Sequence, residues 1–185
     1  DRPTGPASAE AVDPGRPAGS EMVKPVSTPS EGPPKANAWQ YGVGAFDEQS
    51  KRTIDFLPLR HWTGDAWQMS RKLPNPEHGW VLVGAAGGHA GKTQKDSAIR
   101  RWTARQEGKL SISGELKHEQ VGDGDGIRGR VVSSRAGVKG EGKVRSSATQ
   151  TPANNIDGQA GDHIDLIVDC GDDATYEPCL WRRGL

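Results

Sequence analysis

The segment Ala86–Thr93 (AGGHAGKT) carries residues that could bind a nucleotide. It nearly matches a phosphate-binding loop, except that Ala86 stands where such a loop begins with glycine. Loops of that type bind phosphate through backbone N–H groups, a lysine such as Lys92 and a magnesium-ligating hydroxyl such as that of Thr93. A helix has to follow such a loop, and the strict alternation after Gly108 does not fit one. Of the three functions considered for this chain, a nucleotide-binding enzyme therefore has the least support from the sequence.

A second group of residues has the chemistry of a calcium site. Asp123 and Asp125 lie in the glycine-rich segment Gly122–Gly126, and hard cations prefer carboxylate oxygens. The twelve-residue pattern of a helix–loop–helix calcium site is absent, and glycine–aspartate turns also form for backbone reasons. We expect no required cofactor, and calcium at Asp123 and Asp125 is the candidate structural ion.

Aromatic side chains offer a third kind of chemistry, the stacking of flat sugar faces on rings. Trp62 and Trp67 lie in the polar segment Arg60–Glu77 and are the main candidates, with Tyr41 as a weaker one. The alternative is that these rings cap a hydrophobic core. Hydrogen bonds to sugar hydroxyls would come from the polar side chains near them, namely Gln68, Arg71 and Asp65.

Catalytic residues do not stand out. The five histidines are scattered, and no serine lies in a glycine-flanked nucleophile elbow. Asp165 and Asp169 would lie on one face of a predicted strand, about 13–14 Å apart, which is too far for the usual glycosidase pair. We expect that the protein is not an enzyme.

The two cysteines, Cys170 and Cys179, lie near the C-terminus. A disulfide between them would stabilise the last segment by about 2–3 kcal/mol in the loop-entropy model. It would also require an oxidising compartment. Two free buried thiols are the alternative.

The composition limits the partners. Lys+Arg and Asp+Glu both number 24, so the net charge is zero and gives no electrostatic signal for nucleic acid or an anionic membrane. No apolar run approaches the roughly 18–20 residues of a membrane span. Asp1–Asn37 holds eight of the thirteen prolines and no aromatic residue, which predicts a disordered linker over residues 1–37. The folded domain is expected over residues 38–185.

Short strands separated by turn signals must position these side chains. Gly108–His118 alternates, with apolar residues such as Leu110 and Leu116 on one side. We expect this strand to pair with Ala98–Thr103 in a central hairpin. A second clear strand is His163–Cys170. Further strands are expected over Trp39–Phe46, Thr53–Leu59, Trp80–Val83 and Ile127–Arg135, with Ala136–Ala160 mostly irregular. This pattern predicts an all-β fold, an antiparallel β-sandwich or jelly roll.

Several of these pieces resemble a known family when they are taken in order. The segments are Trp39–Gly42, Gly87–His89, Ala98–Thr103, Gly114–His118, Gly122–Arg128, Val131–Arg135 and Gly161–Asp169. They are similar to a β-sandwich segment of large secreted planctomycete proteins of the cytochrome c type, which combine a haem c module with domains of unknown function. The haem attachment signature Cys-x-x-Cys-His is absent here, and the chain departs from the family pattern at Tyr176–Leu185.

The resemblance implies an exported, non-catalytic accessory domain that lies next to other domains of a larger chain. Its expected location is extracellular, periplasmic or on the cell surface. The jelly-roll pattern is similar to that of carbohydrate-binding modules, so the first interpretation is a domain that binds polysaccharide through exposed aromatic rings. The second is a purely structural or protein-docking β-sandwich.

Overall fold

The computed structural model describes residues 39–84, 87–118 and 125–172, together with the strand Pro178–Arg182. The predicted linker over residues 1–37 lies outside these ranges. Within them every named strand pairing is antiparallel, and one short 3-10 helix, η1 (Gln94–Asp96), is the sole helical element. The all-β prediction is therefore confirmed.

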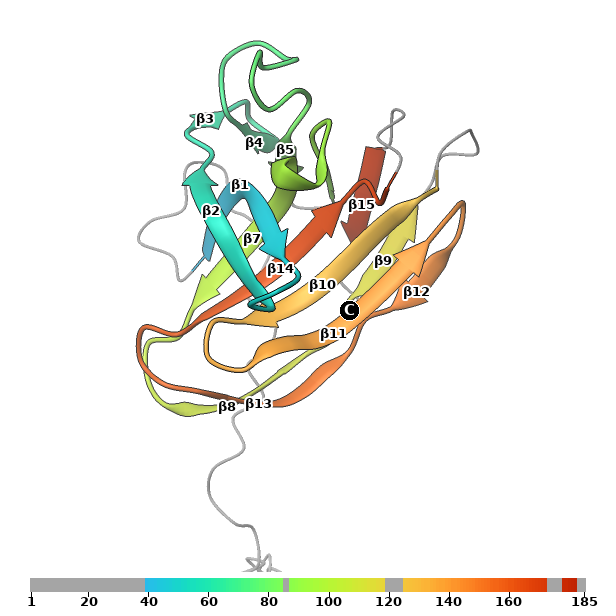
Figure 1. Cartoon of the computed structure of the whole chain (residues 1–185). Helices are drawn as coiled ribbons and strands as arrows, with labels where there is room; N and C mark the ends of the chain where they lie inside the picture. Colours follow the sequence, from blue (N-terminus) through green and yellow to red (C-terminus); the bar gives the residue numbers. More distant parts are fainter. Residues whose placement is uncertain (1–38, 85–86, 119–124, 173–177, 183–185) are drawn as a thin grey trace, which may run out of the picture.

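The larger continuous surface in Figure 1 is a six-stranded sheet, called sheet A here. In spatial order its strands are β11 (Gly137–Val144), β10 (Ile127–Ser133), β14 (His163–Asp169), β7 (Ser97–Thr103), β1 (Trp39–Asp47) and β2 (Arg52–Pro58). The central strands β10, β14 and β7 run side by side, and β2 and β11 form the two edges. The edge strand β2 ends at Pro58, in keeping with the restriction of proline to strand edges and ends.

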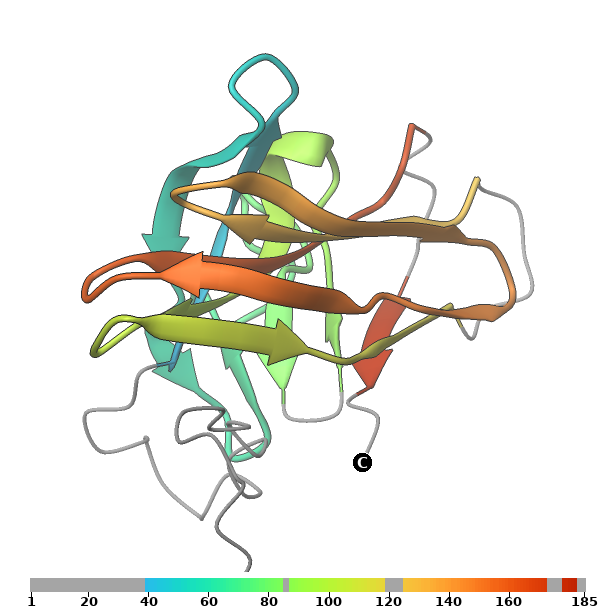
Figure 2. The same cartoon turned by 90° about the horizontal axis from the view of Figure 1, so that it is seen from below.

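The second layer consists of short strands. Seven of them form sheet B, in the order β12 (Ala148–Gln150), β9 (Glu115–His118), β15 (Pro178–Arg182), β6 (Gly88–His89), β5 (Leu82–Gly84), β4 (Ala66–Gln68) and β3 (His61–Trp62). A separate pair, β8 (Gly108–Ile112) with β13 (Ala153–Gly158), extends this layer and is seen clearly in Figure 2.

The main hydrophobic core lies between the two layers. Val131 and Ile164 of sheet A pack in one cluster with Leu116 of β9 and Ile156 of β13, and none of the four is more than 3% exposed. Trp102 packs against this cluster. Burial of apolar side chains from both layers against each other is the arrangement of a β-sandwich.

Ion pairs and aromatic rings cover the outer face of sheet A. Arg101 binds Asp165 with two hydrogen bonds of 2.7 and 2.8 Å, and its guanidinium lies 3.9 Å from the ring centre of Phe56. Arg130 binds Asp169 at 2.8 Å, and both side chains are at least 97% buried. Such charge-assisted bonds position the strands, and loss of one partner leaves a buried charge that costs about 3–5 kcal/mol. Asp165 and Asp169 are thus both paired with arginines.

The predicted central hairpin is wrong in its pairing. β7 pairs with β1 on one side and β14 on the other, so it has no free edge for β8. The alternating segment Gly108–His118 is also interrupted at Gly114, where it passes from β8 into β9 and so from the β8–β13 pair into sheet B. The predicted inward face is correct, because Leu116 is fully buried and Leu110 packs against the core.

The segment Ala136–Ala160 contains three strands in place of the expected irregular structure. β11 is rich in glycine, and glycine is normally unfavourable in a strand. Segments that pass close to β11 explain why this strand contains glycine. A Cβ atom at Gly140 would lie 3.0 Å from the Pro152 carbonyl oxygen, and one at Gly142 would lie 2.8 Å from the Thr149 side chain. The strand therefore needs glycine where another segment passes close to it.

Candidate functional site

Three aromatic side chains that the sequence singles out lie together between the two sheets. Tyr41 and Trp67 stack with ring centres 6.3 Å apart and planes 12° from parallel. Trp62 lies on Trp67 with ring centres 5.3 Å apart and a tilt of 47°. These offset and tilted arrangements are the ones that aromatic pairs prefer. We call Tyr41, Trp62 and Trp67 the aromatic cluster.

Strand register explains why these rings meet. Trp62 of β3 stands directly opposite Trp67 of β4, and Trp67 stands opposite Val83 of β5. Directly opposed residues share a face of a sheet, and buried Val83 marks that face as the inner one. Tyr41 reaches the cluster from β1. Tyr41 and Trp67 also pack against a core group of Val43, Leu59, Val81, Val83 and Ala98.

The polar residues predicted to assist the rings do not gather around them. Gln68 follows Trp67 in the same strand, so it points to the opposite face, where it is only 7% exposed. Asp65 is exposed in the β3–β4 turn, where it accepts a hydrogen bond from the Thr63 hydroxyl. Arg71 is exposed in the loop beyond β4. Of the predicted binding residues, the structure brings together the three rings.

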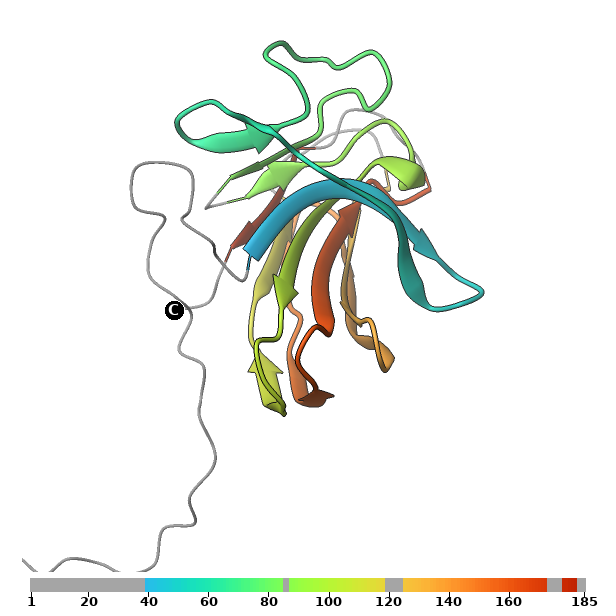
Figure 3. The same ribbon diagram turned by 90° about the vertical axis from the view of Figure 1, so that its left-hand side faces the viewer.

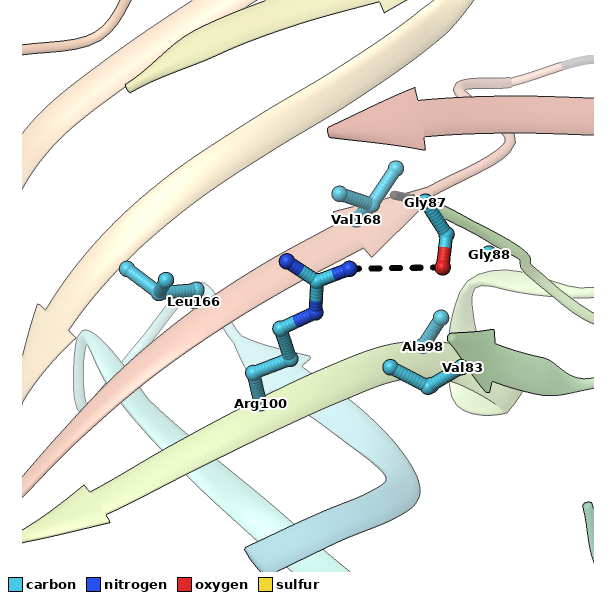
Figure 4. Close-up of a pocket in the computed structure, with 7 residues that line it drawn as sticks. All are labelled: Val83, Gly87, Gly88, Ala98, Arg100, Leu166 and Val168. Atoms are coloured by element: carbon cyan, nitrogen blue, oxygen red, sulfur yellow. Dashed lines mark hydrogen bonds between the residues drawn. The ribbon is translucent and has the colours of Figure 1, made fainter. Parts of the chain in front are cut away.

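A small cavity lies between the sheets (Figure 4). Two of its lining residues, Val83 and Ala98, belong to the core group against which Tyr41 and Trp67 pack. The guanidinium of Arg100 donates hydrogen bonds to the carbonyl oxygens of Gly84 and Gly87 and so ties the β5–β6 connection to sheet A. Tyr41 stands opposite Arg100 in the β1–β7 pair, which links the cavity to the cluster. The lining residues are Val83, Gly87, Gly88, Ala98, Arg100, Leu166 and Val168.

Trp80 was missed as a candidate binding residue, because the prediction places it in the strand Trp80–Val83. Its side chain is 41% exposed, whereas Val81 and Val83, which follow it, are at most 3% exposed. The strand β5 begins only at Leu82, so Trp80 belongs to the end of the preceding loop. The neighbouring pair Gly79–Trp80 after two prolines at Pro74 and Pro76 is the signal that could have suggested a loop.

The segment that resembles a phosphate loop makes internal contacts. The Thr93 hydroxyl donates to the Asp96 carboxylate at 2.7 Å and accepts from the backbone N–H of Lys95. The stem of Lys92 lies close to Gly79. The three-residue helix η1 and then β7 follow, where a phosphate loop would precede a long helix. Ala86 lies outside the described residues.

The calcium and disulfide predictions fall partly outside the described residues. Asp123 is not described, and Asp125 accepts hydrogen bonds from Lys143 at 2.8 Å and from the backbone N–H of Asp172. No group of three acidic, histidine or cysteine side chains in the described ranges has the geometry of a metal site. Cys170 is a buried free thiol here, and burial raises its pKa. The side chain of Cys179 is not described, so a disulfide between the two cysteines stays a prediction.

Comparison with known proteins does not identify a relative. The chain matches no protein-family model, no curated protein and no solved structure. The resemblance to planctomycete domains therefore stays a prediction. Across the parts that the structure describes, no helix is long and apolar enough to cross a membrane.

Proposed function

We propose that this chain is a non-catalytic accessory domain that binds polysaccharide. The observation that supports the proposal is the aromatic cluster. Trp62 stands at its end, on the edge strand β3 of sheet B. The faces of Tyr41 and Trp67 are turned toward other rings, so the outer side of Trp62 is the ring surface that a sugar would use. Apolar sugar faces stack on indole.

The proposal also covers the setting of the domain. In the secreted proteins that it resembles, such a domain would hold polysaccharide for its neighbours, outside the cytoplasm or at the cell surface. One small contact binds weakly, and several linked contacts gain affinity through effective concentration. No covalent chemistry is required.

A specific observation favours the second interpretation, a structural or protein-docking domain. Tyr41 and Trp67 pack against buried Val43 and Val81, so part of the aromatic cluster stabilises the fold. A packed tryptophan contributes to stability whether or not a ligand is present.

The test is affinity electrophoresis of the full 185-residue chain in gels that contain neutral or acidic polysaccharides. We expect one class of polymer to retard the chain and the substitution Trp62→Ala to weaken that retardation. Trp62→Phe should retain most of it, because a flat ring remains. Ile54→Ala is the matched control, since Ile54 is 41% exposed on β2 and lies in the other sheet.

Two further results decide between the interpretations. If no polymer retards the chain, the structural domain is favoured. Retardation that EDTA abolishes, and that calcium restores, would identify calcium as a structural or bridging ion.

A further inference from the structure

The loop Ser70–Trp80, here called the Trp80 loop, projects from the top of the molecule in Figure 1 and is seen from another side in Figure 3. Its last residue carries the most exposed of the described tryptophans, at 41%. An exposed indole on an ordered support offers a flat apolar face on which a sugar ring can stack.

Internal hydrogen bonds hold the shape of this loop. Asn75 and Gly79 exchange two backbone hydrogen bonds of 2.6 and 2.9 Å. The side-chain oxygen of Asn75 accepts from the backbone N–H groups of Glu77 and His78, each at 3.0 Å. Because the loop is ordered before binding, little conformational entropy is lost when Trp80 contacts a ligand.

A second set of contacts anchors the loop to the segment before β7. The Nδ1 atom of His78 lies 2.9 Å from the Asp96 carboxylate, which also accepts from the Thr93 hydroxyl. The side chain of Lys92 runs across Gly79, where a Cβ atom would lie 3.0 Å from the Lys92 Cγ. The ammonium group of Lys92 is therefore held beside the residue that precedes Trp80.

The Trp80 loop and the segment before β7 that anchors it carry mostly positive charges. Arg71, Lys72, Lys92 and Lys95 are all exposed or partly exposed, and none has an ion-pair partner among the described residues. Other exposed lysines of the described chain do have partners, such as Lys51 with Glu48 and Lys109 with Asp157, although Lys139 does not. The exposed carboxylate of Glu77 is the opposing charge on the loop, because Asp96 is buried against His78 and Thr93.

We infer that the Trp80 loop is a contact for an anionic polysaccharide, one that carries uronate or sulfate groups. The indole of Trp80 stacks on a sugar ring, and the cations around it pair with the acidic groups. The Arg71 guanidinium can bind a carboxylate or a sulfate through two parallel N–H groups. This inference rests on the proposed function, since it names the class of polysaccharide, but it uses residues outside the aromatic cluster.

Two other polyanions fit less well. A membrane contact needs several apolar side chains together, and the other exposed large apolar residues of the described chain, Ile54 and Leu57, lie on β2 of sheet A. Nucleic-acid binding domains usually carry an excess of positive charge, whereas the net charge of this chain is zero. An acidic polysaccharide combines negative charges with flat apolar sugar faces.

The experiment is affinity electrophoresis of the full chain against alginate, dextran sulfate, uncharged dextran and single-stranded DNA. We expect alginate or dextran sulfate to retard the chain, dextran not to, and added salt to weaken the effect. Trp80→Ala should lower the affinity about tenfold, the change that loss of one stacked ring produces. Trp80→Phe should lower it less. Urea unfolding of each variant verifies that it is folded.

A matched pair of variants tests the role of charge. Arg71→Gln should weaken binding several-fold. Lys139→Gln should not, because Lys139 is an exposed cation on β11 of sheet A, which belongs to the other layer. Equal weakening by the two substitutions would overturn the inference, since it would indicate diffuse attraction.

The remaining outcomes separate this inference from the proposed function. Retardation by dextran alone, or by acidic polymers with Trp62→Ala weakening it and Trp80→Ala having no effect, would overturn the inference and leave polysaccharide binding intact. Tighter binding to DNA than to either acidic polysaccharide would overturn the inference as well. If no polysaccharide retards the wild-type chain, both the inference and the proposed function are wrong.

Discussion

The aromatic cluster and the Trp80 loop use the same residue type in opposite ways. Trp67 lies in β4 with its ring between Tyr41, Trp62 and the core. Trp80 lies just before β5, the strand that pairs with β4, and its ring is 41% exposed. The first ring stabilises the packing of two sheets, whereas the second is supported by hydrogen bonds that do not involve the ring. Proximity in the fold therefore does not assign a common role to two tryptophans.

The largest expected difference between the two regions is in stability. Trp67→Ala should lower the free energy of unfolding by about 3 kcal/mol, because it removes a ring packed against the core. Trp80→Ala should change it by less than about 0.5 kcal/mol, as for other surface substitutions. Urea unfolding followed by circular dichroism measures both values. Equal decreases in the free energy of unfolding of the two variants would contradict the distinction between a packed ring at Trp67 and an exposed ring at Trp80.

The backbone of the Trp80 loop should be the next most sensitive feature. Gly79 has a φ of +67°, and a Cβ atom there would lie 3.0 Å from the Lys92 side chain. Gly79→Ala should therefore lower the free energy of unfolding by about 1–2 kcal/mol. Gly108→Ala is the control, since a Cβ atom at Gly108 would have no neighbour within 4 Å. A neutral result for Gly79→Ala would mean that the loop can take another shape.

The anchor of the loop should have a smaller and local effect. Asp96→Asn replaces a charged acceptor of the His78 hydrogen bond by a neutral amide, which weakens that bond by about 1 kcal/mol. We expect the backbone N–H groups of Glu77 and His78 to exchange with deuterium several-fold faster. The N–H groups of β10 should keep their rates. Uniform acceleration across the chain would show that Asp96 stabilises the whole domain instead.

The smallest change in stability is expected at His89, which lies on β6 next to β5 in sheet B. His89 of β6 stands opposite Leu82 of β5, and burial lowers its pKa from 6.5, partly offset by a hydrogen bond to the Ala90 carbonyl. The unfolded chain then takes up a proton more readily than the folded one as the pH falls through 6.5. The contribution of neutral His89 to the free energy of unfolding is thus present at about pH 7 and is lost toward lower pH.

The variant His89→Gln isolates that contribution. Its free energy of unfolding should decrease less between about pH 7 and about pH 5 than that of the wild-type chain, as measured by urea unfolding at both values. His61→Gln is the control, since it removes a half-buried histidine from β3 of the same sheet. An unchanged pH dependence in His89→Gln would show that other groups cause the acid destabilisation.

The clearest predictions from the sequence concern long alternating strands. In β14, Ile164 and Val168 point to the core between the layers, and Asp165 points to the other face, as the two-residue period predicts. Pairing between strands was not predictable in the same way. Backbone hydrogen bonds join strands without regard to side-chain type, so the sequence could not show that β7 pairs with β1 and β14.

The candidate site was predictable only in part, and for a related reason. The residue types of Tyr41, Trp62 and Trp67 identified rings able to stack, and the structure brings them together. Strands of two or three residues such as β3 and β4 are too short to show a period, so nothing in the chain indicated which way each ring points. The sequence alone determined which side chains carry flat rings that are able to stack. The tertiary structure decided that Trp67 is packed and Trp80 is exposed, because burial depends on which strands lie opposite one another.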